Sequence, residues 1–284
     1  MIRLCAFSDE ASASLDGQIK ALKRNGIYYT ELRGVDGVNV ADITEENAEK
    51  IKNKLDENNI KVWSLGSPYG KVSLSDGFSE DKLFSQLHRL CRLCRVFGCG
   101  RIRVFSFYQA YDKKEKVFDL LRRSVGIARG YGVGLYHENE KDIYGDTAER
   151  VKELYDNVEG LKFVYDPANY IQCGEDADKT LPLASLASYY HIKDVIAKTG
   201  ELVPAGHGDG KIAEILKRTD SDTTLTVEPH LAVFSGYAEI DGREMKNKYK
   251  FNSNDEAFDA AAAAIKKLLV ENGYVYENGG YVKI

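Results

Sequence analysis

The stretch from residue 134 to residue 167 reads GLYHENEKDIYGDTAERVKELYDNVEGLKFVYDP. It opens with a β-rich run at Gly134–His137, continues through an amphipathic segment, and closes with a second β-rich run at Lys162–Tyr165. Two short runs separated by a longer amphipathic stretch are typical of parallel strands joined by a crossover helix. An acidic residue follows each run directly, Glu138 after the first and Asp166 after the second.

This unit recurs along the whole chain and gives eight pairs of strand and helix. The strands are expected at Arg3–Phe7, Tyr28–Leu32, Val62–Leu65, Arg101–Phe105, Gly134–His137, Lys162–Tyr165, Tyr189–Ile192 and Thr224–Val227. Thr44, followed by two glutamates, has the pattern of a helix N-cap, and Gly26, Gly98 and Gly132 follow periodic runs as C-terminal glycines do. The pattern, with 284 residues and no linker, predicts an α/β fold consisting of a single (β/α)₈ TIM barrel, one domain over residues 1–284.

Composition narrows the classes of function. The chain is 43% hydrophobic and 29% charged with a net charge of -5, which is typical of a globular protein and argues against a wide basic surface for nucleic acid. No apolar run approaches a membrane span, and the first residues lack a signal-peptide pattern. Five scattered cysteines fit a reducing compartment. We therefore expect a cytoplasmic protein that has neither a nucleic acid nor a membrane as partner.

Two segments depart from the repeat. Pro229–Asn252 is a long polar and aromatic connection that would lie on the C-terminal face of the barrel, as a lid, a substrate wall or a plain surface excursion. Near the end of the chain, Tyr274–Tyr276 and Tyr281–Ile284 flank Asn278–Gly280, which favours a β-hairpin that caps the barrel or adds a strand to a partner. The chain is compatible with a monomer or a homodimer.

Four consecutive predicted strands end in side chains that bind metals. Glu138, Asp166, His191 and Glu228 lie at or just after the ends of the fifth to eighth strands. The ends of neighbouring strands are adjacent on the rim of a closed barrel, so these side chains can converge. Three carboxylates and one imidazole form a ligand set for one divalent ion. Such a set suits Mn²⁺, Mg²⁺ or Co²⁺, whereas structural zinc is usually bound by thiolates; Zn²⁺ is also among the ions expected here. Without a cation the three carboxylates would repel one another.

These residues belong to a wider set of short motifs. The set comprises Phe7-Ser8-Asp9-Glu10, Glu31-Leu32-Arg33, Glu138-Asn139-Glu140, Asp166-Pro167-Ala168-Asn169, His191-Ile192-Lys193-Asp194, Gly206-His207-Gly208-Asp209 and Glu228-Pro229-His230. In this order the motifs resemble the xylose isomerase-like TIM-barrel superfamily, in particular its sugar phosphate isomerase/epimerase group. The resemblance spans nearly the whole barrel and does not specify a substrate.

The resemblance implies that Glu138, Asp166, His191 and Glu228 coordinate the metal, and that Glu138 and Glu228 also transfer protons. A metal chelated by a carbonyl and the neighbouring hydroxyl stabilises an enediolate, while one carboxylate removes the carbon-bound proton and the other returns it. The substrate expected from this chemistry is a small polyhydroxylated molecule, a sugar or a sugar phosphate, and the enzyme would be an isomerase or epimerase of carbohydrate metabolism.

Two departures from the ketose epimerase pattern weaken the case for free ketoses. Asn169 stands where those enzymes have a histidine, and Ala197 stands where they have a substrate-binding arginine. Arg33 and Lys193 are candidates to bind an anionic group of the substrate, or else they pair with nearby carboxylates. The expected substrate-binding residues are Arg33, Asn169, Lys193, His207 and His230. His137, one residue before Glu138, is expected to point away from the metal.

Three other functions remain open. A metal-dependent dehydratase of an inosose-like polyol ketone needs the same enediolate and differs in expelling hydroxide. A nuclease like the endonuclease IV group shares the barrel but uses additional histidines, and the third and fourth strand ends here offer Ser67 and Ser106 instead. A non-catalytic sugar-binding barrel would be expected to have lost a ligand or one of the two glutamates, yet all are present.

Overall fold

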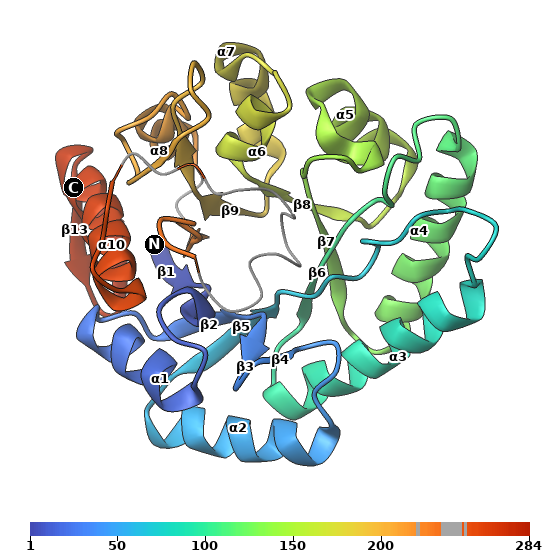
Figure 1. Cartoon of the computed structure of the whole chain (residues 1–284), viewed down its shortest axis with the longest axis horizontal. Coiled ribbons are helices and arrows are strands. Elements are labelled where there is room, and N and C mark those ends of the chain that lie inside the picture. Colours follow the sequence, from blue (N-terminus) through green and yellow to red (C-terminus); the bar gives the residue numbers. More distant parts are fainter. Residues whose placement is uncertain (220–221, 234–245, 247–248) are drawn as a thin grey trace.

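Eight parallel strands close into a barrel surrounded by helices (Figure 1). The computed structural model describes residues 1–219, 222–233, 246 and 249–284. Neighbouring strands pair in chain order, and β12 pairs with β1 from Ile2↔Thr223 to Ala6↔Val227, which closes the ring. The barrel strands are β1 (Ile2–Ala6), β2 (Tyr29–Leu32), β5 (Lys61–Leu65), β6 (Arg101–Val104), β7 (Gly134–Glu138), β8 (Lys162–Tyr165), β9 (Tyr189–Ile192) and β12 (Thr223–Val227).

The predicted TIM barrel is confirmed, and every strand boundary lies within one residue of its expected position. The agreement is close because strands that are buried on both sides form short, nearly continuous apolar runs, and the polar residues at either end of a run mark the strand boundaries. All five residues of β12, for example, are buried, although three of them are threonines. β-Branched side chains of this kind favour extended backbone.

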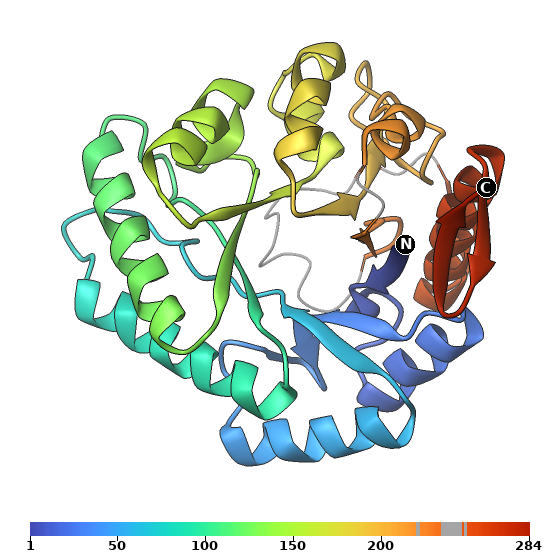
Figure 2. The ribbon, with the colours of Figure 1, turned by 180° about the vertical axis from the view of Figure 1, so that it is seen from behind.

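Helices cover the outside of the ring (Figures 1 and 2). They are α1 (Leu15–Arg24), α2 (Glu45–Glu57), α3 (Glu80–Phe97), α4 (Lys114–Gly130), α5 (Ala148–Asn157), α6 (Pro167–Gln172), α7 (Ala177–Thr180), α8 (Ile212–Arg218) and α10 (Asn254–Glu271). The side chain of Thr44 accepts a hydrogen bond from the Asn47 amide, as its predicted N-cap role requires. Gly98 ends α3 with a φ of 66°, a conformation that glycine adopts at little cost.

The predicted C-terminal hairpin is also present. β13 (Tyr274–Glu277) and β14 (Gly280–Lys283) pair antiparallel, joined by the two-residue turn of Asn278 and Gly279, both with positive φ. β14 also pairs antiparallel with β1, so the hairpin lies outside the ring next to α10 (Figure 2). The long connection predicted at Pro229–Asn252 lies mostly outside the described residues, and its role as a lid or wall stays a prediction.

The described helices include none that combines the length and the apolar character needed to cross a lipid bilayer. The apolar core occupies the space between the barrel and its helices, where residues such as Leu87, Leu121 and Ile265 are fully buried. Charged side chains inside the ring gather instead at the C-terminal ends of the strands, where they form the cluster described next.

Candidate metal centre and active site

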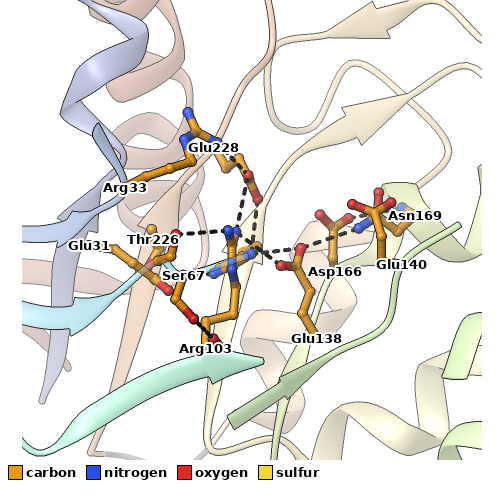
Figure 3. Close-up of polar contacts among 12 residues, drawn as sticks. Glu31, Arg33, Ser67, Arg103, Glu138, Glu140, Asp166, Asn169, Thr226 and Glu228 are labelled. Atoms are coloured by element: carbon orange, nitrogen blue, oxygen red, sulfur yellow. Dashed lines mark hydrogen bonds and ion pairs between the residues drawn. The ribbon is translucent and has the colours of Figure 1, made fainter. Parts of the chain in front are cut away.

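The four predicted ligands meet at the C-terminal ends of four neighbouring strands (Figure 3). Glu138 is the last residue of β7, Asp166 and Glu228 directly follow β8 and β12, and His191 lies in β9. All four side chains are buried, and one potential ligand atom from each lies within 4.8 Å of those of the others. The strand order β7, β8, β9, β12 places the two glutamates at the two ends of this arc, with Asp166 and His191 between them.

His191 is held in an orientation that suits a metal ligand. Its Nδ1 lies 3.0 Å from Glu138 Oε1 and 2.9 Å from Glu228 Oε2, while its Nε2 lies 3.1 Å from Glu31 Oε2. Glu31 also accepts hydrogen bonds from Tyr189 (2.8 Å) and Thr226 (3.1 Å). A carboxylate that accepts a hydrogen bond from one imidazole nitrogen orients the imidazole ring and leaves the other nitrogen for the metal.

Glu31 had no assigned role in the sequence interpretation, which quoted it only as part of a motif. The available signal was an acidic residue inside a predicted strand, Tyr28–Leu32, with no other charged residue. An ionised residue at a buried strand position needs a partner. The identity of that partner, His191 from the opposite side of the ring, depends on barrel closure.

Burial and mutual charge shift the pKa values of these groups in different directions. Burial lowers the pKa of His191, but the carboxylates of Glu138, Glu31 and Glu228 outweigh it and raise this pKa well above its usual value. Burial raises the pKa of Asp166 to about 7, against the opposing charge of Lys193. Burial also acts to raise the pKa of Glu228, yet the charges of His191 and Lys193 hold it well below its usual value. The cluster therefore attracts positive charge.

Two predicted substrate residues, Arg33 and Lys193, pair with carboxylates in the structure. Arg33 Nε and Nη2 donate to Asp9 at 2.8 and 3.0 Å, Nη2 donates to Glu10 at 3.2 Å, and Nη1 donates to Glu228 Oε1 at 3.1 Å. Lys193 Nζ lies 3.0 Å from Asp166 Oδ2. These pairs are the alternative that the sequence interpretation left open beside an anion-binding role, and contact with substrate stays a prediction.

The other predicted substrate residues divide into two groups. The side-chain Nδ2 of Asn169 lies 3.3 Å from Glu138 Oε1 and also donates to the Asn139 carbonyl. The backbone amide of Asn169 donates to Asp166 Oδ1. His230 is buried, with Nε2 3.4 Å from Glu10 Oε1 and 3.5 Å from Glu228 Oε1, and burial lowers its pKa to about 4. His207 is exposed, and its Nδ1 lies 3.0 Å from the Tyr249 hydroxyl, so it does not join the buried cluster.

Arg103 is a further member of the cluster that sequence reasoning missed. It lies in β6, and its Nη1 is 3.1 Å from Glu138 Oε2 and 3.9 Å from Glu228 Oε1 (Figure 3). The sequence interpretation considered only the serines at this part of the rim, Ser67 and Ser106. Ser67 donates to the Arg103 carbonyl, and Ser106 contacts His137, which points away from the ligand group as expected.

The residues present fit a divalent cation. Asp166 Oδ2 and Glu228 Oε2 are buried and have no hydrogen-bond partner among the described residues, although each lies near a basic group. The buried cluster also contains six carboxyl groups (Asp9, Glu10, Glu31, Glu138, Asp166, Glu228) but three permanently charged basic side chains (Arg33, Arg103, Lys193). A divalent ion would reduce this excess, so the group can hold a metal.

A second group, Glu10, Glu228 and His230, shares Glu228 with the first, and its potential ligand atoms also lie within 4.8 Å of one another. Burial raises the pKa of Glu10 to about 8 in spite of the Arg33 charge, so this carboxyl is mostly protonated near neutral pH. Because Glu10 and Glu228 both contact Arg33, we regard this group as the surroundings of the first group.

Comparisons with known proteins agree with the fold. The model of the family "Xylose isomerase-like TIM barrel" matches residues 19–268, whereas no curated protein matches the sequence. Three similar solved structures are the probable 3-DHS dehydratase AsbF from Bacillus anthracis, the IolI protein with a bound zinc atom, and an L-ribulose 3-epimerase.

Their similarity is one of fold over nearly the full length. AsbF is 18% identical with a TM-score of 0.70, over 94% of this chain and 99% of that chain. IolI is 16% identical with a TM-score of 0.73, over 95% of this chain and 99% of that chain. The epimerase is 17% identical with a TM-score of 0.71, over 96% of each chain. With the family model matching most of the barrel, the chain belongs to the xylose isomerase-like TIM-barrel family.

Proposed function

We propose that this protein is a divalent-metal-dependent isomerase or epimerase of a small polyhydroxylated substrate, a sugar or a sugar phosphate. The observation that carries the proposal is the placement of Glu138 and Glu228. They lie at opposite ends of one arc of strand ends, and each directs one carboxylate oxygen to within 3.0 Å of the same nitrogen, Nδ1 of His191. Two carboxylates on either side of one ligand position are what proton transfer between two faces of a substrate requires.

Glu138, Asp166, His191 and Glu228 would hold the metal, which we expect to be Mn²⁺, Mg²⁺, Co²⁺ or Zn²⁺. A bound divalent ion polarises a carbonyl and its neighbouring hydroxyl and so acidifies the carbon-bound hydrogen next to the carbonyl. The zinc bound by the structurally similar IolI protein supports a metal in this chain as well.

The chain's own residues would then carry out the proton transfer. One of the two glutamates removes the carbon-bound proton, and the electron pair of the broken C–H bond is delocalised into the adjacent carbonyl. The other glutamate returns a proton to the opposite face of the same carbon, which inverts its configuration. If the proton is returned to the former carbonyl carbon instead, and the proton of the neighbouring hydroxyl moves to the former carbonyl oxygen, an aldose and a ketose interconvert. Asn169, 3.3 Å from Glu138 Oε1, would help to orient Glu138.

A second candidate function is a metal-dependent dehydratase, favoured by the similarity to the probable dehydratase AsbF. The first proton removal is the same in both reactions. In dehydration the electron pair expels a hydroxide from the next carbon, and the removed proton accompanies it as water. The products separate the two candidates, because isomerisation preserves the molecular formula and dehydration loses one water.

The test is to load the purified protein with Mn²⁺ in deuterated water and to follow deuterium uptake into carbon positions across a panel of sugars, sugar phosphates and inososes. We expect uptake with at least one compound, reduced by about 100-fold or more in Glu138→Gln and in Glu228→Gln. Glu57→Gln, on the outer helix α2, is the matched control and should exchange like the wild type. Undiminished exchange in both site variants would refute the two-glutamate mechanism.

A further inference from the structure

Arg103 is the one described cation within 4 Å of both proposed proton-transfer residues apart from His191. It projects from β6 into the cluster and is 4% exposed. Its Nη1 lies 3.1 Å from Glu138 Oε2 and 3.9 Å from Glu228 Oε1, and its Nη2 donates to the Gly66 carbonyl at 3.1 Å. A single guanidinium thus links the two ends of the ligand arc (Figure 3).

The contacts of each glutamate divide between its two oxygens. Glu138 Oε1 faces His191 Nδ1 at 3.0 Å and Asn169, while Oε2 faces Arg103. Glu228 Oε2 faces His191 Nδ1 at 2.9 Å, while Oε1 faces Arg33 and Arg103. One oxygen of each carboxylate is therefore directed at the ligand position, and the other is held by a guanidinium.

Packing alone does not explain an arginine at this position. The guanidinium carbon lies 5.1 Å from the centre of the Phe7 ring and 4.9 Å from that of Phe105, so much of its surroundings is apolar. Its Nε–H is buried and has no acceptor among the described residues. A buried donor without an acceptor and a buried charge both oppose folding, and an apolar side chain of similar volume would avoid both costs.

We propose that Arg103 is a positioning residue for the proton-transfer pair. It holds the outer oxygen of Glu138, restrains Glu228 from the same side, and so fixes which oxygen of each carboxylate faces the metal and the substrate. This inference rests on the proposed function, because it assigns Arg103 to the same reaction.

A positioning role for Arg103 affects metal binding in a way that a packing role does not. The positive charge of Arg103 lies next to two metal ligands and therefore weakens the binding of a divalent cation. Removing this charge should tighten metal binding while it slows proton transfer, because Glu138 is no longer held. Removing a residue that only packs would loosen the site, so metal binding would weaken or stay unchanged.

The experiment compares Arg103→Met and Arg103→Lys with the wild type. Mn²⁺ affinity is measured at fixed pH by the loss of the electron paramagnetic resonance signal of the free ion, and deuterium uptake is measured with a compound that the wild type exchanges. For Arg103→Met we expect Mn²⁺ affinity to rise by about tenfold or more and exchange to fall by about 100-fold, with partial recovery in added guanidinium chloride below denaturing concentration. For Arg103→Lys we expect affinity within about threefold of the wild type and exchange lowered by about tenfold, because the charge remains while the hydrogen bond from Nη2 to the Gly66 carbonyl, which positions the guanidinium, is lost.

Arg101→Met is the matched control, since it removes the same charge from the same strand. The guanidinium carbon of Arg101 lies 3.7 Å from the centre of the Trp63 ring, and among the described residues no contact joins Arg101 to the ligand group, so Mn²⁺ affinity should not change. Unchanged or weaker Mn²⁺ binding by a folded Arg103→Met would overturn the proposal. If Arg103→Met does not fold, undiminished exchange by Arg103→Lys would overturn it. Failure of the proposed function has a different signature, namely a wild type that binds no Mn²⁺ or exchanges none of the compounds.

Discussion

At the scale of single residues, the partner of the imidazole decides how His191 can act. Glu31 Oε2 lies 3.1 Å from Nε2 of His191, whereas Glu138 and Glu228 lie at the other nitrogen of the imidazole, Nδ1. Tyr189 and Thr226 in turn hold Glu31 in place. The ligand atom Nδ1 is thus oriented by residues of three different strands, and the effect of each on metal binding can be measured separately.

Replacing the Glu31 carboxylate should weaken the metal site without removing a ligand. In Glu31→Gln the charge that orients His191 is lost, and we expect Mn²⁺ affinity to fall by about 10- to 100-fold, measured by isothermal titration calorimetry. Thr226→Val removes one of the hydrogen bonds to Glu31 and should have a smaller effect in the same direction. Wild-type affinity in Glu31→Gln would show that His191 does not depend on this contact.

Metal affinity should increase with pH. Burial opposes the protonation of His191, but the surrounding carboxylates raise its pKa well above the usual value, so His191 carries a proton near neutral pH. Mn²⁺ can bind Nδ1 only when this proton leaves, and Asp166, with a pKa of about 7, adds a partial second proton. Below these pKa values the apparent affinity should therefore rise by about tenfold per pH unit for each proton displaced.

The measurement is a series of Mn²⁺ titrations between about pH 6 and about pH 8. The number of protons released is obtained by repeating one titration in buffers of different ionisation enthalpy. Between one and two protons per ion are expected. An affinity that does not change with pH would contradict the assignment of His191 and Asp166 as ligands.

At the scale of elements, the ends of the strands position the site, and the helix caps stabilise the frame around it. Glu138, Asp166, His191 and Glu228 come from four successive barrel strands, and Asp166 also caps α6 by accepting from the Asn169 amide. Thr44, the cap of α2, is by contrast exposed, and no contact joins it to the ligand group among the described residues. Stability and metal binding should therefore be separable by mutation.

Thr44→Ala tests this separation at α2. Loss of the hydrogen bond from the Asn47 amide should lower the free energy of unfolding by about 1 kcal/mol, measured by urea denaturation, with Mn²⁺ affinity unchanged. Thr44→Ser keeps the hydroxyl and should lie close to the wild type. A change in Mn²⁺ affinity of more than about threefold in Thr44→Ala would indicate that the outer helix and the site are coupled.

The sequence was sufficient for the barrel strands and for placing the four candidate ligands at the ends of neighbouring strands, because both depend on local patterns. Strand ends are marked where an apolar run meets an acidic or imidazole residue, as at Tyr165 and Asp166. The roles of Arg103 and Glu31 depend on contacts with Glu228 and His191 across the ring and, for Arg103, also with Glu138 on the neighbouring strand, and no local pattern carries that information. For Arg33 and Lys193 the sequence shows the positive charge. Whether each side chain binds an anionic group of the substrate or pairs with a carboxylate of the chain depends on distances within the cluster.

At the scale of the whole molecule, barrel closure brings residues from both halves of the chain into one buried cluster. Pairing of β12 with β1 places Glu228 near Arg33, 195 positions earlier in the chain, with Nη1 and Oε1 3.1 Å apart. Without a metal, protons on Glu10 and His191 offset part of the excess of carboxyl groups, and burying the remaining carboxylates together still opposes folding. A bound cation therefore links the stability of the barrel to its proposed function.

The most direct test of this metal centre is the stoichiometry of Mn²⁺ bound to the wild type and to Asp166→Ala, measured by equilibrium dialysis with elemental analysis. Asp166 is the ligand of choice because it has no proposed role in proton transfer. We predict one ion per wild-type chain and a loss of affinity of about 100-fold or more in folded Asp166→Ala. A wild type that binds no Mn²⁺, or an Asp166→Ala variant that binds it as tightly as the wild type, would contradict the account.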